Sequence, residues 1–101
     1  MQTEVKLTQS PVALARQALR VAKESIPLYS HPFASRDFTQ HQLFAILILR
    51  QSLKIDYDGI IGLLDNSSDL REVLGLNKIP NHSTLYYAEL RLVRKGYLKS
   101  P

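Results

Sequence analysis

Residues able to do catalytic chemistry are few in this chain and scattered along it. The three histidines, His31, His41 and His82, stand in different predicted elements and do not form the HExxH spacing of a zinc site. The chain has no cysteine, which excludes disulfides, thiolate metal ligands and a cysteine nucleophile. Its four glycines form no phosphate-binding loop, and no GxSxG motif is present. We therefore expect no catalytic residues, no metal site and no cofactor.

Residues able to contact nucleic acid concentrate near the C-terminus. Hydroxyl groups in the first turn of a helix can donate to phosphates or base edges, and tyrosines can hydrogen-bond phosphate or stack. Arginine can reach phosphate or guanine. The alternative is that the tyrosines fill the edge of the core and the arginines are simply solvated. The candidate DNA-binding residues are Ser83, Thr84, Tyr86, Tyr87, Arg91, Arg94 and Lys95.

The positive charge of the chain is concentrated at the same end. The net charge is +4 and the sequence pI is about 9.6. Residues 1–38 carry five basic and three acidic side chains, and residues 39–90 carry four basic and six acidic ones. Residues 91–101 carry four basic side chains and no acidic one. A local basic stripe attracts polyanions, although cations also favour helix C-termini for purely structural reasons.

The elements that must position these residues are predicted to be helices. The length of 101 residues suits one domain. We expect an all-α fold of about five helices, with a helix-turn-helix-like unit in the C-terminal half packed on the second helix. Residues 1–38 would comprise a helix at about 11–25 and a linker containing proline and serine, and residues 39–101 a helical DNA-binding domain. The other helices are expected at about 39–54, from Asp56 to the turn at 66–68, from Ser67 or Ser68 to Gly75, and from Ser83 to about Lys95.

Capping signals support these boundaries. Ser10 precedes Pro11 at the first helical position, and Thr39 with Gln42 has the form of a capping box. The unbroken apolar run 43–49 fits a buried strand or a buried helix; its continuation to about residue 54 and the cap before it favour a helix, which would be the centre of the core. In the first helix, the apolar residues Leu14, Ala18, Val21 and Ala22 recur at helical spacing. Asp56 and Asp58 suit the start of the third helix, whose Gly59 and Gly62 each lower its stability by about 1 kcal/mol relative to alanine.

Residues 39–95 resemble the N-terminal region of prokaryotic insertion-sequence transposases of the DDE type. The resemblance rests on His41-Gln42-Leu43, Leu49-Arg50-Gln51-Ser52-Leu53-Lys54, Asp56-Tyr57-Asp58-Gly59-Ile60, Leu63-Leu64, Leu70-Arg71, Leu74-Gly75-Leu76, Ile79-Pro80, Ser83-Thr84-Leu85 and Arg91-Leu92. It implies a helical region that binds double-stranded DNA and recognises the terminal inverted repeats of a mobile element. Where that family often has a basic residue after Asp-Tyr, this chain has Asp58.

The resemblance also bears on catalysis. In that family an RNase H-like domain with three metal-binding acidic residues follows this region, and those carboxylates hold the two metals that drive strand transfer. None of the acidic residues of this chain can be assigned to that role. We therefore expect a truncated transposase that binds DNA and is not an enzyme by itself.

Two other functions remain as alternatives. One is a helical protein-interaction or dimerisation module without DNA binding, which would use the first and second helices; a homodimer is possible in either case. The other is a small metal-dependent nuclease, weakened by the missing ligand cluster. No apolar stretch approaches the roughly 18 residues of a membrane span, and the N-terminus has no apolar core of a signal peptide. We therefore expect a cytoplasmic protein.

Overall fold

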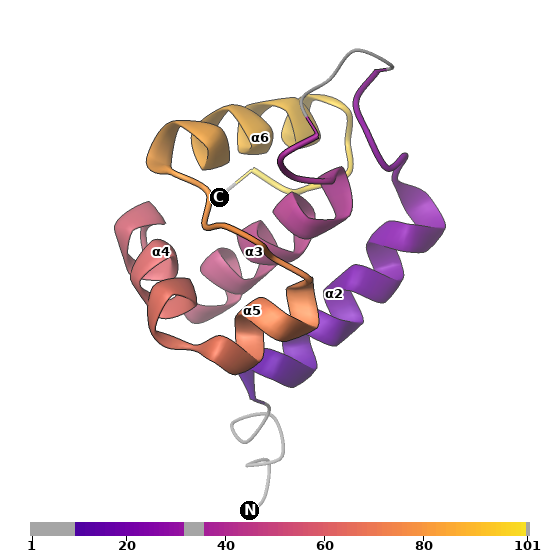
Figure 1. Cartoon of the computed structure of the whole chain (residues 1–101). Helices are drawn as coiled ribbons and strands as arrows, with labels where there is room; N and C mark the ends of the chain where they lie inside the picture. The colour runs from indigo at the N-terminus through magenta and orange to yellow at the C-terminus, as the bar shows by residue number, and fades with distance from the viewer. Residues whose placement is uncertain (1–9, 32–35, 101) are drawn as a thin grey trace, which may run out of the picture.

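The computed structural model describes residues 10–31 and 36–100, and in these residues it contains five α-helices and no strand. The helices are α2 (Pro11–Ser25), α3 (Gln40–Leu53), α4 (Tyr57–Asn66), α5 (Ser68–Leu74) and α6 (His82–Arg94). The predicted all-α fold is therefore confirmed. Figure 1 shows α3 running through the middle of the molecule, with α6 above it, α2 on one side, α4 on the other and α5 below it, next to α2.

The central position of α3 follows from its sequence. Thr39 and Gln42 form the predicted capping box, because the Thr39 hydroxyl accepts from the Gln42 N–H and the Gln42 side chain accepts from the Thr39 N–H. From Leu43 to Leu49 every residue except Ile48, which is half-buried, is buried. A helix that is apolar on all sides can be accommodated only where other helices surround it. Accordingly α2, α4 and α6 all pack on α3.

Helix α2 packs on α3 and α5 through a row of alanines. The Ser10 hydroxyl accepts from the Ala13 N–H, which caps the helix as predicted. Ala15, Ala18 and Ala22 form the buried row. Val21, which the sequence pattern grouped with the apolar face, is instead 50% exposed. It precedes Ala22 by one residue and is therefore rotated by about 100° around the helix, away from α3.

The segment after α2 anchors the start of α3. The Gln40 N–H donates to the Leu28 carbonyl at 2.8 Å, and the Gln40 side-chain amide donates to the Pro27 carbonyl at 3.0 Å. His41 Nε2 donates to the Ile26 carbonyl at 2.6 Å. Helix α2 and residues 39–98 thus share one hydrophobic core.

Helices α4 and α5 begin and end where local capping dictates. Asp56 accepts from the Gly59 N–H and caps α4, and Ser67 accepts from the Leu70 N–H and caps α5. Gly75 ends α5 with a φ of 69°, a conformation that glycine adopts without the steric cost of a Cβ. Gln42 of α3 donates to the Leu74 and Gly75 carbonyls, which satisfies backbone groups left open at the end of α5.

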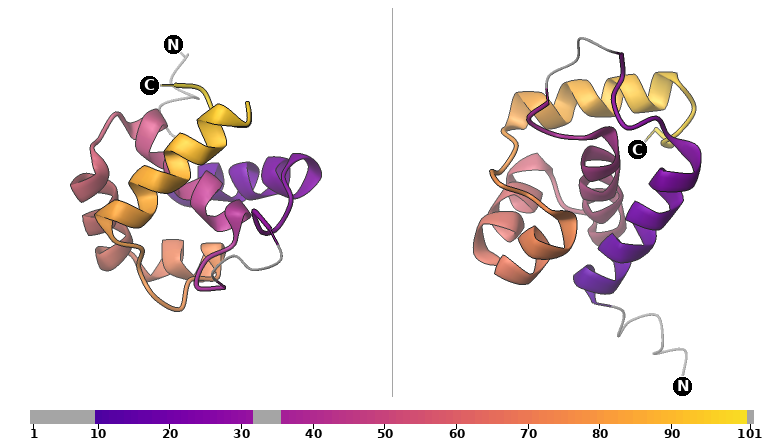
Figure 2. Two further views of the ribbon diagram at one scale, coloured as in Figure 1. Left: turned by 90° about the horizontal axis from the view of Figure 1, so that it is seen from above. Right: turned by 45° about the vertical axis from the view of Figure 1, so that its right-hand side comes forward.

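Helix α6 lies across α3 and α4 (Figure 2). Beyond it the chain turns at Gly96 and folds back, so that Leu98 is buried and its N–H donates to the Leu92 carbonyl. Residues 75–81 connect α5 to α6, and these two helices are not among the pairs with extensive contacts. The helix-turn-helix-like unit therefore stays a prediction.

Candidate nucleic-acid interface

Helix α6 carries every candidate DNA-binding residue except Lys95, which is its C-cap. The helix begins earlier than predicted, because Asn81 rather than Ser83 is its N-cap and accepts from the Thr84 N–H at 2.8 Å. Asparagine and serine cap helices about equally well, so residue type alone did not distinguish the two positions. As a result Ser83 lies in the first turn with its side chain exposed, and Thr84 is half-buried.

The two tyrosines project from the outer side of α6. Tyr86 is 44% exposed and Tyr87 63% exposed, and their rings meet edge to face with centroids 5.2 Å apart. Leu90, one turn further along, is 43% exposed. The alternative in which the tyrosines fill the edge of the core is therefore wrong. This side of the helix instead offers two phenols and an apolar side chain to a partner.

The three basic candidates differ in their surroundings. Arg94 and Lys95 are exposed at the C-terminal end of α6. Arg91 is half-buried, and its Nε donates to the Gln40 side-chain oxygen at 3.2 Å. Burial lowers the pKa of Arg91 from its ordinary value. Arg91 is thus held in place by its hydrogen bond to α3, whereas Arg94 and Lys95 extend into solvent.

A small cavity brings three of the candidates together. Its volume is about 230 Å³, and one side of it is lined by Thr84, Tyr87 and Arg91. The other side is formed by α3 and by the segments at 29–30 and 37–38. Asp37, on the rim of this cavity, pairs with Lys78 at 3.3 Å. The structure thus brings these three candidates together, while Ser83, Tyr86 and Arg94 lie outside the cavity.

Sequence reasoning missed Glu89, which determines the charge of the interface. Glu89 is the single acidic residue in the segment 82–95, and it is buried, with 5% of its surface exposed. Arg50 of α3 donates to its Oε2 at 3.0 Å, and Gln51 donates to the same oxygen at 3.2 Å. Its position four residues after Leu85 and three before Leu92, on the core stripe, was the signal that it faces inward.

The phenol of Tyr57 completes this buried network by donating to Glu89 Oε1. Burial, and then the hydrogen bond to Glu89, raise the pKa of Tyr57 to about 12, so that the phenol stays protonated and continues to donate. The Arg50 guanidinium lies 5.0 Å from the centre of the Tyr57 ring and also donates to the Ile55 carbonyl. Tyr57 in turn meets the His82 ring edge to face, at 4.8 Å between centroids. The network therefore locks α6 onto α3 and α4.

These contacts give α6 an outer side with positive charge alone. Arg94 and Lys95 are its exposed charges and half-buried Arg91 lies beside them, because the carboxylate of the helix is turned inward and paired with Arg50. The arrangement can bind an anionic surface, since no carboxylate of α6 opposes it. Neutral hydroxyl donors in the first turn and the exposed tyrosines extend the same surface toward the N-terminal end of the helix.

The histidines and carboxylates of the described residues are the side chains that could bind a metal. Among residues 10–31 and 36–100, no group of three or more histidine, aspartate or glutamate side chains could hold a metal ion. Two of the histidines have structural contacts, His41 with the Ile26 carbonyl and His82 with Tyr57. No helix in this part of the chain is long and apolar enough to cross a membrane.

Comparison with known proteins does not assign the chain to a family. No family model, no curated protein and no solved structure matches its sequence or fold. The resemblance of residues 39–95 to the N-terminal region of insertion-sequence transposases therefore stays a prediction from the sequence.

Proposed function

We propose that this chain binds double-stranded DNA through the outer side of α6. The observation that carries the proposal is the inward position of Glu89, which leaves the exposed charges of α6 uniformly positive. Uniform positive charge on one helix face is the electrostatic basis of phosphate binding. Ser83 in the first turn of α6 is exposed, and so are the phenols of Tyr86 and Tyr87. These neutral donors are consistent with the same role.

The residues of α6 have distinct parts in the proposed complex. Arg94 and Lys95 neutralise phosphates, and the phenols of Tyr86 and Tyr87 donate to phosphate oxygens. Ser83, in the exposed first turn, is the residue nearest to base edges if the N-terminal end of α6 enters the major groove, as the second helix of a helix-turn-helix does. Thr84 and Arg91 of α6 face the neighbouring elements, and we assign them the role of holding α6 in position.

The test is the binding of the purified chain to a generic DNA duplex, measured by fluorescence anisotropy from about 50 to 200 mM salt. The logarithm of the binding constant should fall linearly with the logarithm of the salt concentration. The double variant Arg94→Ala/Lys95→Ala should bind more weakly and reduce the magnitude of the slope by about 2, because each lost phosphate contact removes about one unit.

A control with two cations removed is available outside α6 and outside α2. Lys54→Ala/Lys78→Ala removes two exposed basic side chains from other parts of the molecule. This control should retain the wild-type slope. If both double variants lost affinity equally, the attraction would be a general effect of the net charge, and the assignment to α6 would be wrong. Absence of any binding by the folded chain would refute DNA binding altogether.

The biological role that we propose is the DNA-binding region of an insertion-sequence transposase. It rests on the sequence resemblance of residues 39–95 together with the positive face of α6. The terminal inverted repeats of an element with a related transposase provide the probe. A duplex carrying such a repeat should bind at least about tenfold more tightly than its scrambled version at 150 mM salt, since specific complexes exceed non-specific ones by more than this. Equal affinity for both duplexes would leave a DNA-binding protein without the transposase role.

A further inference from the structure

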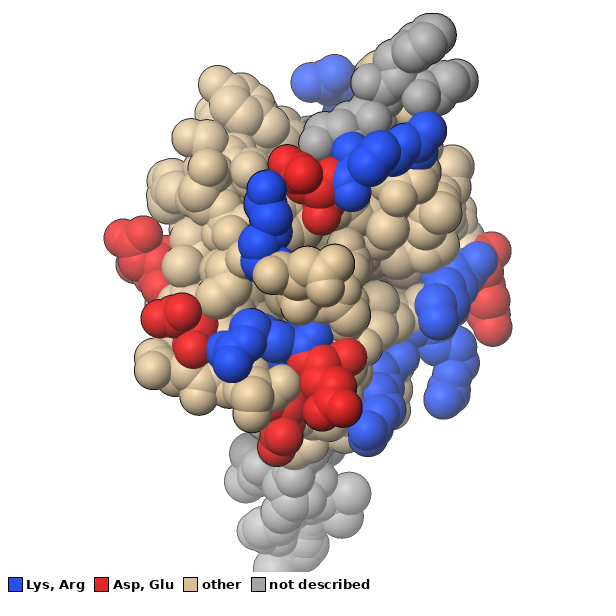
Figure 3. Space-filling view, viewed as in Figure 1, with Lys and Arg blue, Asp and Glu red and all other residues tan. Residues whose placement is uncertain are grey.

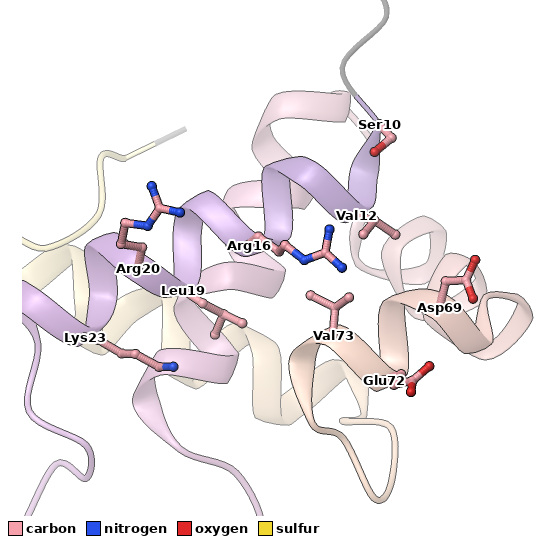
Figure 4. A pocket seen from close by; sticks show the side chains of 9 residues that line it. All are labelled: Ser10, Val12, Arg16, Leu19, Arg20, Lys23, Asp69, Glu72 and Val73. Atoms are coloured by element: carbon pink, nitrogen blue, oxygen red, sulfur yellow. The ribbon is translucent and has the colours of Figure 1, made fainter.

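A groove lies away from α6, between α2 and α5. Its volume is about 900 Å³. Its apolar surface comes from half-buried Val12 and Leu19 of α2 and Val73 of α5. Figure 4 shows these three side chains turned toward the space between the two helices. The groove is therefore an apolar strip bordered by charged residues.

The charges on its two sides are opposite. The α2 side carries the exposed cations Arg16, Arg20 and Lys23, and the α5 side carries the exposed carboxylates of Asp69 and Glu72. Figure 3 shows basic side chains gathered along α2 and acidic side chains over α5. Within the described part of the chain, no ion pair joins these two sets. The groove thus presents unpaired charges of both signs around an apolar strip.

The separation of charge on α5 has a structural cause. Arg71 is the one basic residue of α5, and it does not face the groove. Its guanidinium donates to the Leu64 and Asp65 carbonyls at 2.7 and 2.8 Å, at the C-terminal end of α4. Because Arg71 is engaged there, the side of α5 that borders the groove is acidic.

The charges are also separated along the groove. In Figure 4 the acidic pair of α5 lies at the end near Ser10 and Val12, and Arg20 and Lys23 lie at the opposite end. Val73 and Leu19 lie between the two ends. A two-fold axis through the middle of the groove would place the acidic end of one copy on the basic end of the other, and would bring the apolar strips together. The pattern is therefore its own complement, which is the requirement for an isologous dimer.

We propose that the chain forms a homodimer through the α2–α5 groove. The occupant of the groove is a second copy. A partner must place basic groups on the acidic end, apolar groups on the middle and acidic groups on the basic end, and a copy rotated by the two-fold axis does this. The same carboxylates argue against DNA as the occupant, because they would repel phosphates. Figures 1 and 2 show α6 on the side of the molecule opposite to the N-terminal half of α2 and to α5, so the dimer leaves both copies of α6 exposed.

Sedimentation equilibrium of the full chain without DNA tests the dimer, over about 1 μM to 1 mM protein and at low and high salt. We expect a reversible monomer–dimer equilibrium that shifts toward monomer as salt rises, because exposed charge pairs are screened. A monomer at every concentration overturns the proposal. A dimer that is indifferent to the groove variants described next overturns it too, because the copies would then meet elsewhere.

Charge reversal distinguishes this dimer from any other. Arg16→Glu/Arg20→Glu places acidic residues on both sides of the groove, and Glu72→Arg weakens the acidic side without altering the first turn of α5. Each variant alone should dimerise about tenfold or more weakly than the wild type, since like charges then face each other. An equimolar mixture of the two variants should recover dimerisation, because each copy again meets its opposite. Circular dichroism checks that every variant is helical, and failure of the mixture to recover the dimer would contradict the two-fold arrangement.

Discussion

The outer side of α6 and the groove between α2 and α5 both carry basic side chains but differ in where the acidic side chains lie. On α6 the carboxylate of Glu89 is buried and paired with Arg50, so the exposed charges have one sign. In the groove the cations of α2 stand beside the exposed carboxylates of α5, while Arg71 is engaged by the end of α4. A surface of one sign favours a polyanion, and a surface with both signs favours a partner of mixed charge. Burial of the one carboxylate of a helix is thus enough to make its exposed charges uniform in sign.

The largest effect on stability should follow from removing the buried carboxylate of Glu89. Glu89→Ala leaves the Arg50 guanidinium largely buried without its anion, and takes an acceptor from Tyr57 and Gln51. We expect a loss of about 3 kcal/mol in the free energy of unfolding, measured by urea denaturation. The control Glu72→Ala removes an exposed carboxylate and should change stability by less than about 0.5 kcal/mol. A loss below about 1 kcal/mol for Glu89→Ala would mean that the network does not hold α6 in place.

Part of this arrangement was predictable because it depends on residues close together in the chain. The caps at Ser10, Thr39 and Asp56 were predicted correctly, and Ser67 was one of the two serines predicted to cap α5. Each of these side chains accepts from a backbone N–H three residues further on, so the signal is local. The central position of α3 followed from its apolar run. These features need no knowledge of the tertiary structure, which is why the order and type of the helices were predicted.

The rest depends on partners far apart in the chain. Glu89 meets Arg50 across 39 positions of sequence, so periodicity could place it on the core stripe but could not name the cation that neutralises it. Arg91 looked like a free cation in the sequence, yet it bonds to Gln40, which is 51 residues away. The groove between α2 and α5 is likewise a product of packing, because α3 and α4 lie between these two helices in the sequence. Surfaces formed by segments that are distant in the chain could therefore not be predicted from the sequence.

A carboxylate placed on the outer side of α6 should make that surface resemble the groove. Leu90 is exposed on this side, so Leu90→Glu can be accommodated without disturbing the core. We expect duplex DNA affinity to fall about tenfold at 50 mM salt, because the new charge lies among the residues proposed to meet phosphates. Leu90→Gln is the matched control and should bind nearly as well as the wild type. If both variants lost affinity equally, the apolar side chain of Leu90, rather than the sign of the charge, would govern binding.

A smaller effect should appear in the pH dependence of stability. The pKa of Tyr57 is about 12 in the folded chain and near 10.0 when the phenol is in water, so the unfolded chain releases this proton first. The stabilisation is complete below pH 10 and should be lost progressively as the pH rises from 10 toward 12. Tyr57→Phe should be about 1 kcal/mol less stable than the wild type at pH 7, because Glu89 loses a donor, and should lack this pH-dependent component. Urea denaturation at pH 8, 10 and 11 checks the difference, and parallel curves for the two proteins would contradict it.

The smallest effect should come from a substitution that touches neither surface. Gly62 lies inside α4, and a Cβ added to it would meet no atom within 4 Å. Gly62→Ala should therefore raise the free energy of unfolding by about 0.5–1 kcal/mol, because alanine loses less backbone entropy on forming a helix. Gly75→Ala is the contrasting control: its φ of 69° strains any residue with a Cβ, so that variant should be less stable than the wild type. Gly62→Ala should leave both DNA affinity and dimerisation unchanged, since the differences between α6 and the groove arise from charge placement and not from overall stability. A change in either binding property on this substitution would show that the two surfaces respond to the rigidity of the fold as well.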